Sequence, residues 1–131
     1  RFLDYFPNSE RAKQAQDIIF ELQDKLVYKE LLNAQLYYNL GNYMGNNYQS
    51  AIITAQNALK EYPYTRYKET LSMLILKSKY QEAVQSIEEK KPERFRDVID
   101  EYYSFINDYP SGEYSKEAEN IFKVANKYVK D

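Results

Sequence analysis

One short pattern, an aromatic residue followed by proline, recurs at three places along the chain. The segments Leu3-x-x-Phe6-Pro7-x-Ser9, Leu59-x-x-Tyr62-Pro63-x-Thr65 and Ile106-x-x-Tyr109-Pro110-x-Gly112 align without gaps. Such internal repetition is typical of solenoid proteins, in which each repeat packs on its neighbours and the assembled surface binds other proteins. The repeat therefore constrains both the fold class and the kind of function to be expected.

The residues before each proline fit the last turns of an α-helix. Counted back from Pro63 and Pro110, apolar side chains recur every three or four residues, which places them on one face of a helix. Because the residue before proline avoids helical geometry and proline has no N–H to donate, each helix should end at the aromatic residue. The predicted packing positions are Tyr48, Ala51, Ala55, Ala58 and Tyr62 in one helix and Phe95, Val98, Tyr102, Phe105 and Tyr109 in the other, with Pro7, Pro63 and Pro110 as helix stops.

The residues after each proline fit the start of the next helix. Side-chain oxygens at Ser9, Thr65 and Ser111 can accept hydrogen bonds from the free N–H groups of a first turn. Carboxylates follow near each start, where the helix dipole favours negative charge, at Glu10, Glu69 and Glu113. Apolar stripes then begin at matched distances from the proline: Ala15, Ile18, Ile19 and Leu22; Leu71, Leu74 and Ile75; and Ala118, Ile121, Phe122 and Ala125.

These signals predict a single all-α domain over residues 1–131. We expect helices over residues 9–43 (with a kink near 25–28 as an option), 48–61, 65–87, 93–108 and 114–129. We also expect a turn at Gly45-Asn46-Asn47, and Pro92 suits the first turn of the helix that ends at residue 108. The repeat units then cover residues 9–63 and 65–110, and residues 113–130 form a capping helix. The pattern favours a tetratricopeptide-like right-handed α–α solenoid of about five to six antiparallel helices, with longer helices and turns than the roughly 34-residue tetratricopeptide period.

Composition excludes several classes of chemistry. The chain has no His and no Cys, so its own residues offer no zinc centre, thiol nucleophile or Ser-His triad, and we expect no metal or other cofactor. The acid pairs Glu88-Glu89 and Asp100-Glu101 are adjacent and do not face each other on a helix. The net charge of −2 gives no basic field for nucleic acid, and no apolar run approaches the ~20 residues of a membrane span. We therefore expect a protein that is not an enzyme.

The fifteen tyrosines are the clearest oddity of the composition. Most fit packing positions, where the ring is buried and the hydroxyl reaches water. Neighbouring helical tyrosines point in different directions, so one of a pair can face outward, and exposed tyrosine is enriched in protein interfaces. Arginine near a turn can hold a partner's carboxylate with two hydrogen bonds, and the charged run 88–94 fits either a solvated turn or such a contact. The candidate partner-binding residues are Tyr38, Tyr64, Arg66, Tyr67, Arg94, Arg96 and Tyr103.

Two sets of residues resemble known families. Tyr37-x-x-Leu40-Gly41 followed by Ala51, Ala58 and Pro63 resembles the tetratricopeptide pattern, with Ala55 where that pattern has a large aromatic residue. The Tyr-Pro corners, the long helix 9–43 with Tyr37-Tyr38, and Tyr48-x-x-Ala51…Leu59-x-x-Tyr62-Pro63 are similar to the C-terminal half of the BamD family, the ComL or YfiO type of outer-membrane assembly lipoprotein. The similarity covers nearly the whole chain.

The resemblance implies a scaffold in the machinery that folds β-barrels into the outer membrane of Gram-negative bacteria. It implies a location at the periplasmic face, with a lipid anchor on a Cys that would precede residue 1. The implied partners are the POTRA-bearing barrel subunit, accessory lipoproteins and, in addition, unfolded outer-membrane proteins. Two alternatives stay open: a generic tetratricopeptide adaptor, and the helical scaffold region of a larger envelope enzyme such as a lytic transglycosylase. Because the chain opens in mid-repeat at Arg1, we expect it to be part of a longer protein.

Overall fold

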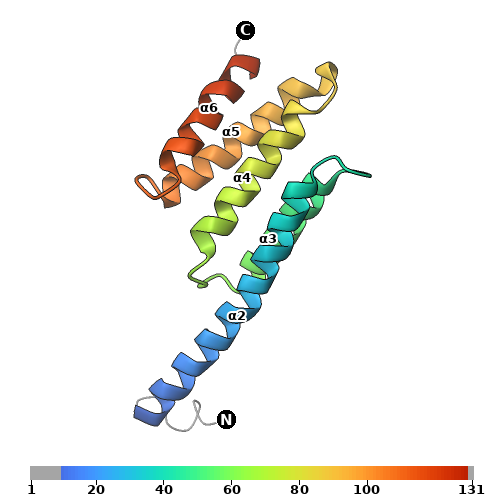
Figure 1. Cartoon of the computed structure of the whole chain (residues 1–131). Coiled ribbons are helices and arrows are strands. Elements are labelled where there is room, and N and C mark those ends of the chain that lie inside the picture. The colour runs from blue at the N-terminus through green and yellow to red at the C-terminus, as the bar shows by residue number, and fades with distance from the viewer. Residues whose placement is uncertain (1–9, 130–131) are drawn as a thin grey trace.

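The computed structural model describes residues 10–129, and every regular element within them is a helix. The α-helices are α2 (Glu10–Leu40), α3 (Asn47–Glu61), α4 (Lys68–Val84), α5 (Lys91–Asp108) and α6 (Ser115–Val129), and a short 3₁₀ helix, η1 (Glu88–Lys90), precedes α5. Each α-helix packs against those before and after it in the chain, and α4 also contacts both α2 and α6. The N-terminal part of α2 extends beyond the rest (Figure 1). The predicted all-α class is confirmed for these residues.

Several predicted boundaries shift by a few residues. Helix α2 continues uninterrupted through residues 25–28, because it contains no Pro or Gly that would break it. It ends at Leu40 and not at residue 43, because Gly41 adopts a φ of +56° and starts the turn. Helix α4 ends at Val84 instead of residue 87, and α5 begins at Lys91 instead of Glu93. Pro92 lies in the first turn of α5, as predicted.

The turn between α2 and α3 depends on two glycines. Gly41 and Gly45 have φ angles of +56° and +138°, which residues with a side chain rarely adopt. A Cβ on Gly41 would also lie 2.7 Å from the hydroxyl oxygen of Tyr48. Asn46 then caps α3, because its side-chain oxygen accepts the N–H of Gln49 at 3.1 Å. The turn therefore covers residues 41–46, more than the predicted 45–47, and Asn47 is the first residue of α3.

The two predicted caps at the described corners are wrong. Helix α4 begins three residues after Thr65, whose hydroxyl oxygen instead accepts the N–H of Tyr67 at 3.3 Å within the connection. Ser111 is exposed and does not cap α6, which begins at Ser115. The N–H of Ser115 donates to the main-chain oxygen of Gly112 at 3.2 Å. In both corners the chain makes an extra tight turn between the proline and the next helix.

Two of the three predicted acidic residues lie in the first turn of a helix, where the helix dipole favours negative charge. Glu10 lies in the first turn of α2 and Glu69 in the first turn of α4, as predicted. Glu113 precedes α6, and Glu117 occupies the first turn of that helix instead. The predicted cap Ser9 and helix stop Pro7 lie outside the described residues.

The two described aromatic–proline corners have the same backbone geometry. Tyr62 has φ −129° and ψ 68°, and Tyr109 has φ −134° and ψ 67°, so both residues leave the helical conformation just before proline. Each tyrosine donates its N–H to the carbonyl oxygen four residues earlier at 2.9 Å. The N–H six residues after each tyrosine then donates to the carbonyl three residues after it, at 3.2 Å in both corners. The predicted helix ends at these two prolines are confirmed.

The two corners differ in the side chains that meet them. At the first corner, the Thr65 hydroxyl donates to Asp24 of α2 at 2.7 Å. At the second corner, Gly112 occupies the position that matches Thr65, and a Cβ there would collide with the Glu69 carboxylate of α4. The Oε2 atom of Glu69 is buried without a hydrogen-bond partner. The hydrogen bond that joins this corner to α4 is instead the one between the hydroxyls of Tyr114 and Thr70, at 3.3 Å.

Two hydrophobic cores lie on the two sides of α4. The first joins α2, α3 and α4 through Val27, Leu31, Ala34, Ile52, Ala55, Ala58, Leu71, Leu74 and Ile75. The second joins α4, α5 and α6 through Met73, Leu76, Ala83, Phe95, Val98, Phe105, Ala118, Ile121 and Ala125. Because α4 contributes to both cores, most of its apolar side chains are buried.

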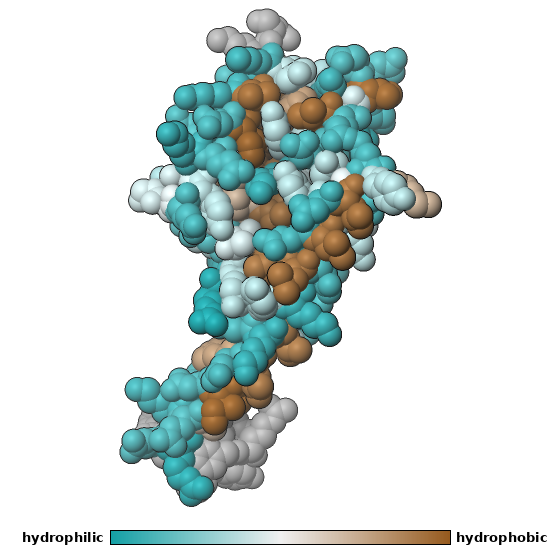
Figure 2. Space-filling view, in the orientation of Figure 1, coloured by the Kyte–Doolittle hydropathy of each residue, from teal (hydrophilic) through white to brown (hydrophobic). Residues whose placement is uncertain are grey.

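The predicted packing positions lie within this arrangement, with one exception. Tyr48, Ala51, Ala55, Ala58, Phe95, Val98 and Phe105 are buried, and Tyr62, Tyr102 and Tyr109 pack against the cores half-buried. The predicted stripes of α4 and α6 are also largely buried. The exception is the stripe of α2, because Ile18, Ile19 and Leu22 are exposed where no other described helix covers them. Figure 2 shows hydrophobic side chains at the surface along α2.

Replacing Ala58 by Phe should destabilise the protein. Ala58 lies on α3, belongs to the first core and is only 4% exposed, so an aromatic ring has no space there. We expect a loss of about 1–3 kcal/mol in the free energy of unfolding, measured by thermal or urea denaturation. Asn57→Phe, at the exposed neighbouring position, is the matched control. Equal melting of the two variants would contradict this packing.

Alkaline pH should weaken the fold through the corner tyrosines. Burial, followed by the carboxylate of the preceding residue, raises the pKa of Tyr62 and of Tyr109 above the ordinary value of 10.0. Such a group stabilises the folded state fully below its unfolded pKa, and this contribution is lost as the pH rises through the folded pKa. The free energy of unfolding, from urea titrations, should therefore fall above pH 10.0, and fall less in the variant Tyr62→Phe/Tyr109→Phe. An identical fall in both proteins would assign the effect to other groups.

Candidate functional site

A cleft of about 330 Å³ opens where the first corner meets α2. One wall comes from α2, with Phe20, Gln23 and Asp24, and the other from residues 61–66. Phe20 and Tyr64 are 44% and 89% exposed. The cleft therefore combines exposed aromatic surface with charged groups, which is the composition of many protein-recognition sites.

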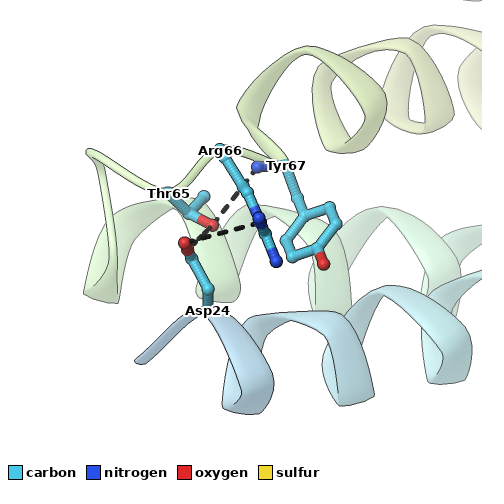
Figure 3. A network of polar contacts seen from close by, with 4 residues as sticks. All are labelled: Asp24, Thr65, Arg66 and Tyr67. Carbon is cyan, nitrogen blue, oxygen red and sulfur yellow. Dashed lines mark hydrogen bonds and ion pairs between the residues drawn. The ribbon is translucent and has the colours of Figure 1, made fainter. Parts of the chain in front are cut away.

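A polar network joins Asp24, Thr65 and Arg66, which line this cleft, to Tyr67 (Figure 3). The buried Thr65 hydroxyl donates to Oδ1 of Asp24 at 2.7 Å and accepts the N–H of Tyr67 at 3.3 Å. The hydroxyl thus links α2 to the residue just before α4. Since hydrogen bonds to a charged group are among the stronger ones, this bond holds the corner at a fixed distance from α2.

Arg66 forms an ion pair with the same carboxylate, that of Asp24. Its Nε atom lies 3.7 Å from Oδ2 of Asp24, and its guanidinium carbon lies 5.3 Å from the centre of the Tyr67 ring. The Arg66 side chain is nevertheless 72% exposed, so most of its N–H groups face solvent. Asp24 and Tyr67 therefore orient a guanidinium that can still bind a carboxylate or a main-chain carbonyl of another protein.

The structure gathers three of the seven candidate partner-binding residues at this corner. Tyr64 and Arg66 line the cleft, and the Arg66 guanidinium lies over the Tyr67 ring. The Tyr67 ring also packs against Tyr28 of α2, with ring centres 5.5 Å apart.

Tyr38 lies elsewhere and is half-buried. Its ring meets that of Tyr48 edge to face at 5.7 Å, and Lys77 Nζ lies 4.9 Å from its centre. Burial, followed by Tyr48 and Glu117, raises the pKa of the Tyr38 hydroxyl. Tyr38 therefore joins α2 to α3 and α4 and offers a partner only part of its ring.

The remaining three candidates are separate from the cleft and lie on α5. Arg94 lines a polar groove among α3, α4 and α5 whose other residues include Lys79, Glu82 and Asp97. Arg96 is exposed. Tyr103 is 54% exposed and borders a cluster in which Tyr102 and Phe122 stack at 4.6 Å. The seven residues therefore do not form one continuous surface.

Sequence reasoning missed the contribution of α2 to the cleft. Asp24 and Phe20 were not candidates, because no local pattern distinguishes them from other residues of a long helix. Thr65 was assigned a capping role, and its polar side chain was the only signal of a partner at this position. The hydrogen bond between Thr65 and Asp24 spans 41 residues of sequence, so it follows from the packing of α2 on the corner.

Comparison with known proteins gives no assignment. No known protein family matches the chain, and no curated protein sequence is significantly similar to it. Within residues 10–129, no helix has the length and apolar character required to cross a membrane.

Removing the Thr65 hydroxyl should loosen the corner. Thr65→Val keeps the side-chain size but leaves Asp24 without its donor, and we expect a loss of about 1–3 kcal/mol in the free energy of unfolding. In a double-mutant cycle with Asp24→Ala, the coupling energy should be about 1 kcal/mol. The cycle with Glu21→Ala, an exposed position on the same helix, should be additive. Additivity in both cycles would show that the hydroxyl and the carboxylate do not interact.

Proposed function

We propose that this protein is a non-enzymatic scaffold of the outer-membrane β-barrel assembly machinery, folded as a tetratricopeptide-like right-handed solenoid. In this function the stack of helices holds partner proteins at fixed positions, and no bond is made or broken. The partners are the POTRA-bearing barrel subunit and accessory lipoproteins, at the periplasmic face of a Gram-negative outer membrane. The observation that carries the proposal is the repeated corner, with matching backbone angles at Tyr62 and Tyr109.

The pattern of helix contacts supports a repeating stack. Each helix contacts its neighbours in sequence, and α4 contacts both α2 and α6, whereas contacts between α3 and α5 are sparser. Helix α4 therefore lies closer to α2 and to α6 than α3 lies to α5. In a stack of helical hairpins, that difference favours curvature with α2, α4 and α6 on the inner side.

The exposed side chains support a role in protein binding. Tyr64 and Arg66 project at a corner that Thr65 fixes against α2. A rigid position lowers the entropy that a side chain loses on binding, and Tyr and Arg are the residue types that most often dominate interface energy. The assignment to barrel assembly comes from the resemblance of the corner residues and of helices 9–43 and 48–61 to the BamD family.

Binding of purified POTRA domains to the full chain tests this proposal. We expect saturable binding, measured by calorimetry or interferometry, and a loss of at least about tenfold in affinity for Tyr64→Ala/Arg66→Ala, as for central interface residues. Tyr103→Ala/Arg96→Ala removes the same residue types from α5 and should change the affinity little.

Each result has a distinct meaning. A loss of affinity confined to Tyr103→Ala/Arg96→Ala would show that the docking surface lies on α5 and not at the cleft. If POTRA domains do not bind the unaltered chain at any accessible concentration, barrel assembly is excluded as the function, and the generic adaptor takes its place.

A further inference from the structure

The outer face of α2, defined here as Ile18, Ile19, Leu22 and Leu26, is apolar and exposed. These side chains are 57%, 42%, 55% and 54% exposed. Ile18 and the buried Val27 are nine residues, or about two and a half turns, apart, so they lie on opposite sides of the helix. Helix α2 thus has one apolar side in the first core and a second apolar side without a partner among the described helices.

The repeat shows what happens at the same positions in the other two units. Counted from the corner proline, Ile18 corresponds to Leu74 and to Ile121, which are only 4% and 7% exposed. Leu22 corresponds to Ser78 and to Ala125, and both of these are fully buried. The same repeat positions are therefore buried in α4 and α6 and exposed in α2.

The same kind of element covers these positions in both other units. On α4, Leu74 is covered by the preceding hairpin, α2 and α3, in the first core. On α6 these positions are covered by the preceding hairpin, α4 and α5, in the second core. In each case the second helix of the covering hairpin ends at a tyrosine–proline corner, and in α3 it presents the small side chains of Ala55 and Ala58. The outer face of α2 lacks such a hairpin.

The opposite end of the stack is different. The outward residues of α6 are mostly polar, and Lys123 pairs with Glu119 at 3.2 Å. Further exposed polar residues of this helix are Lys116, Asn120, Asn126 and Lys127. A polar outer helix is typical of the closing end of a repeat stack. It also makes the α6 end of a second copy a poor fit to the apolar outer face of α2.

We propose that the outer face of α2 docks an α-helical hairpin of the same repeat type, whose second helix carries apolar side chains and ends at an aromatic–proline corner. The stack is then closed at α6 and open for extension at α2. This inference shares with the proposed function only the stacked arrangement of helices. It concerns a surface other than the cleft around Arg66.

A tandem chain tests the proposal. A copy of residues 10–62 is joined directly to residues 7–131, so that the copied Tyr62 precedes Pro7 and the chain continues into the original α2. We expect slower amide hydrogen exchange over residues 18–26 of the original α2 than in the single chain. Leu22→Asp in the original copy should lower the melting temperature of the tandem chain by several degrees and leave that of the single chain unchanged. Ile87→Asp, which is exposed but outside this face, is the control and should leave both unchanged.

Three results would overturn the inference. The first is unchanged hydrogen exchange in the tandem chain. The second is an equal effect of Leu22→Asp in the tandem and single chains. The third is a dimer of the single chain, seen by sedimentation, that Leu22→Asp dissociates, because the occupant would then be a second copy. POTRA binding by the single chain should not change with Leu22→Asp, so failure of this inference is distinguishable from failure of the proposed function.

Discussion

Two half-buried tyrosines, each followed by proline, determine how the rest of the structure is built. The proline ends a helix at a defined residue, and the tyrosine ring packs against the adjoining core, which fixes the direction in which the chain leaves. Since Tyr62 and Tyr109 have nearly equal backbone angles, the same change of direction is made twice. The regular succession of helices follows from that repetition, and so does the position of the cleft at the first corner.

Helix α4 connects the two hydrophobic cores, because it contributes side chains to both. Leu71 and Leu74 belong to the first core, and Met73 and Leu76 belong to the second. A helix with apolar residues on both sides needs a partner on each, so neither half of this domain can bury its hydrophobic surface alone. The shared helix also explains why the sequence of α4 shows little contrast between a polar and an apolar face.

The features that could be predicted from the sequence were those with a local cause. The helix stops at Pro63 and Pro110 follow from the chemistry of proline, and the buried stripes follow from their spacing. Spacing does not reveal whether another element covers a stripe, so the exposure of Ile18 could not be foreseen. Nor could the hydrogen bond between Thr65 and Asp24, because the partner of a polar side chain depends on which distant helix packs beside it. Arg66 was singled out for its place near a turn, and only the packing of α2 on that turn forms the cleft around it.

The two described corners carry different side chains three residues after the tyrosine, and each is joined to a helix by a different contact. At the first corner the Thr65 hydroxyl joins Asp24 of α2 to the N–H of Tyr67, just before α4. At the second corner the matching residue is Gly112, and the hydroxyls of Tyr114 and Thr70 share a hydrogen bond of 3.3 Å that joins this corner to α4. Because Gly112 has no hydroxyl, the second corner cannot repeat the network around Asp24, and the chemistry of the Arg66 cleft is specific to the first of these two corners.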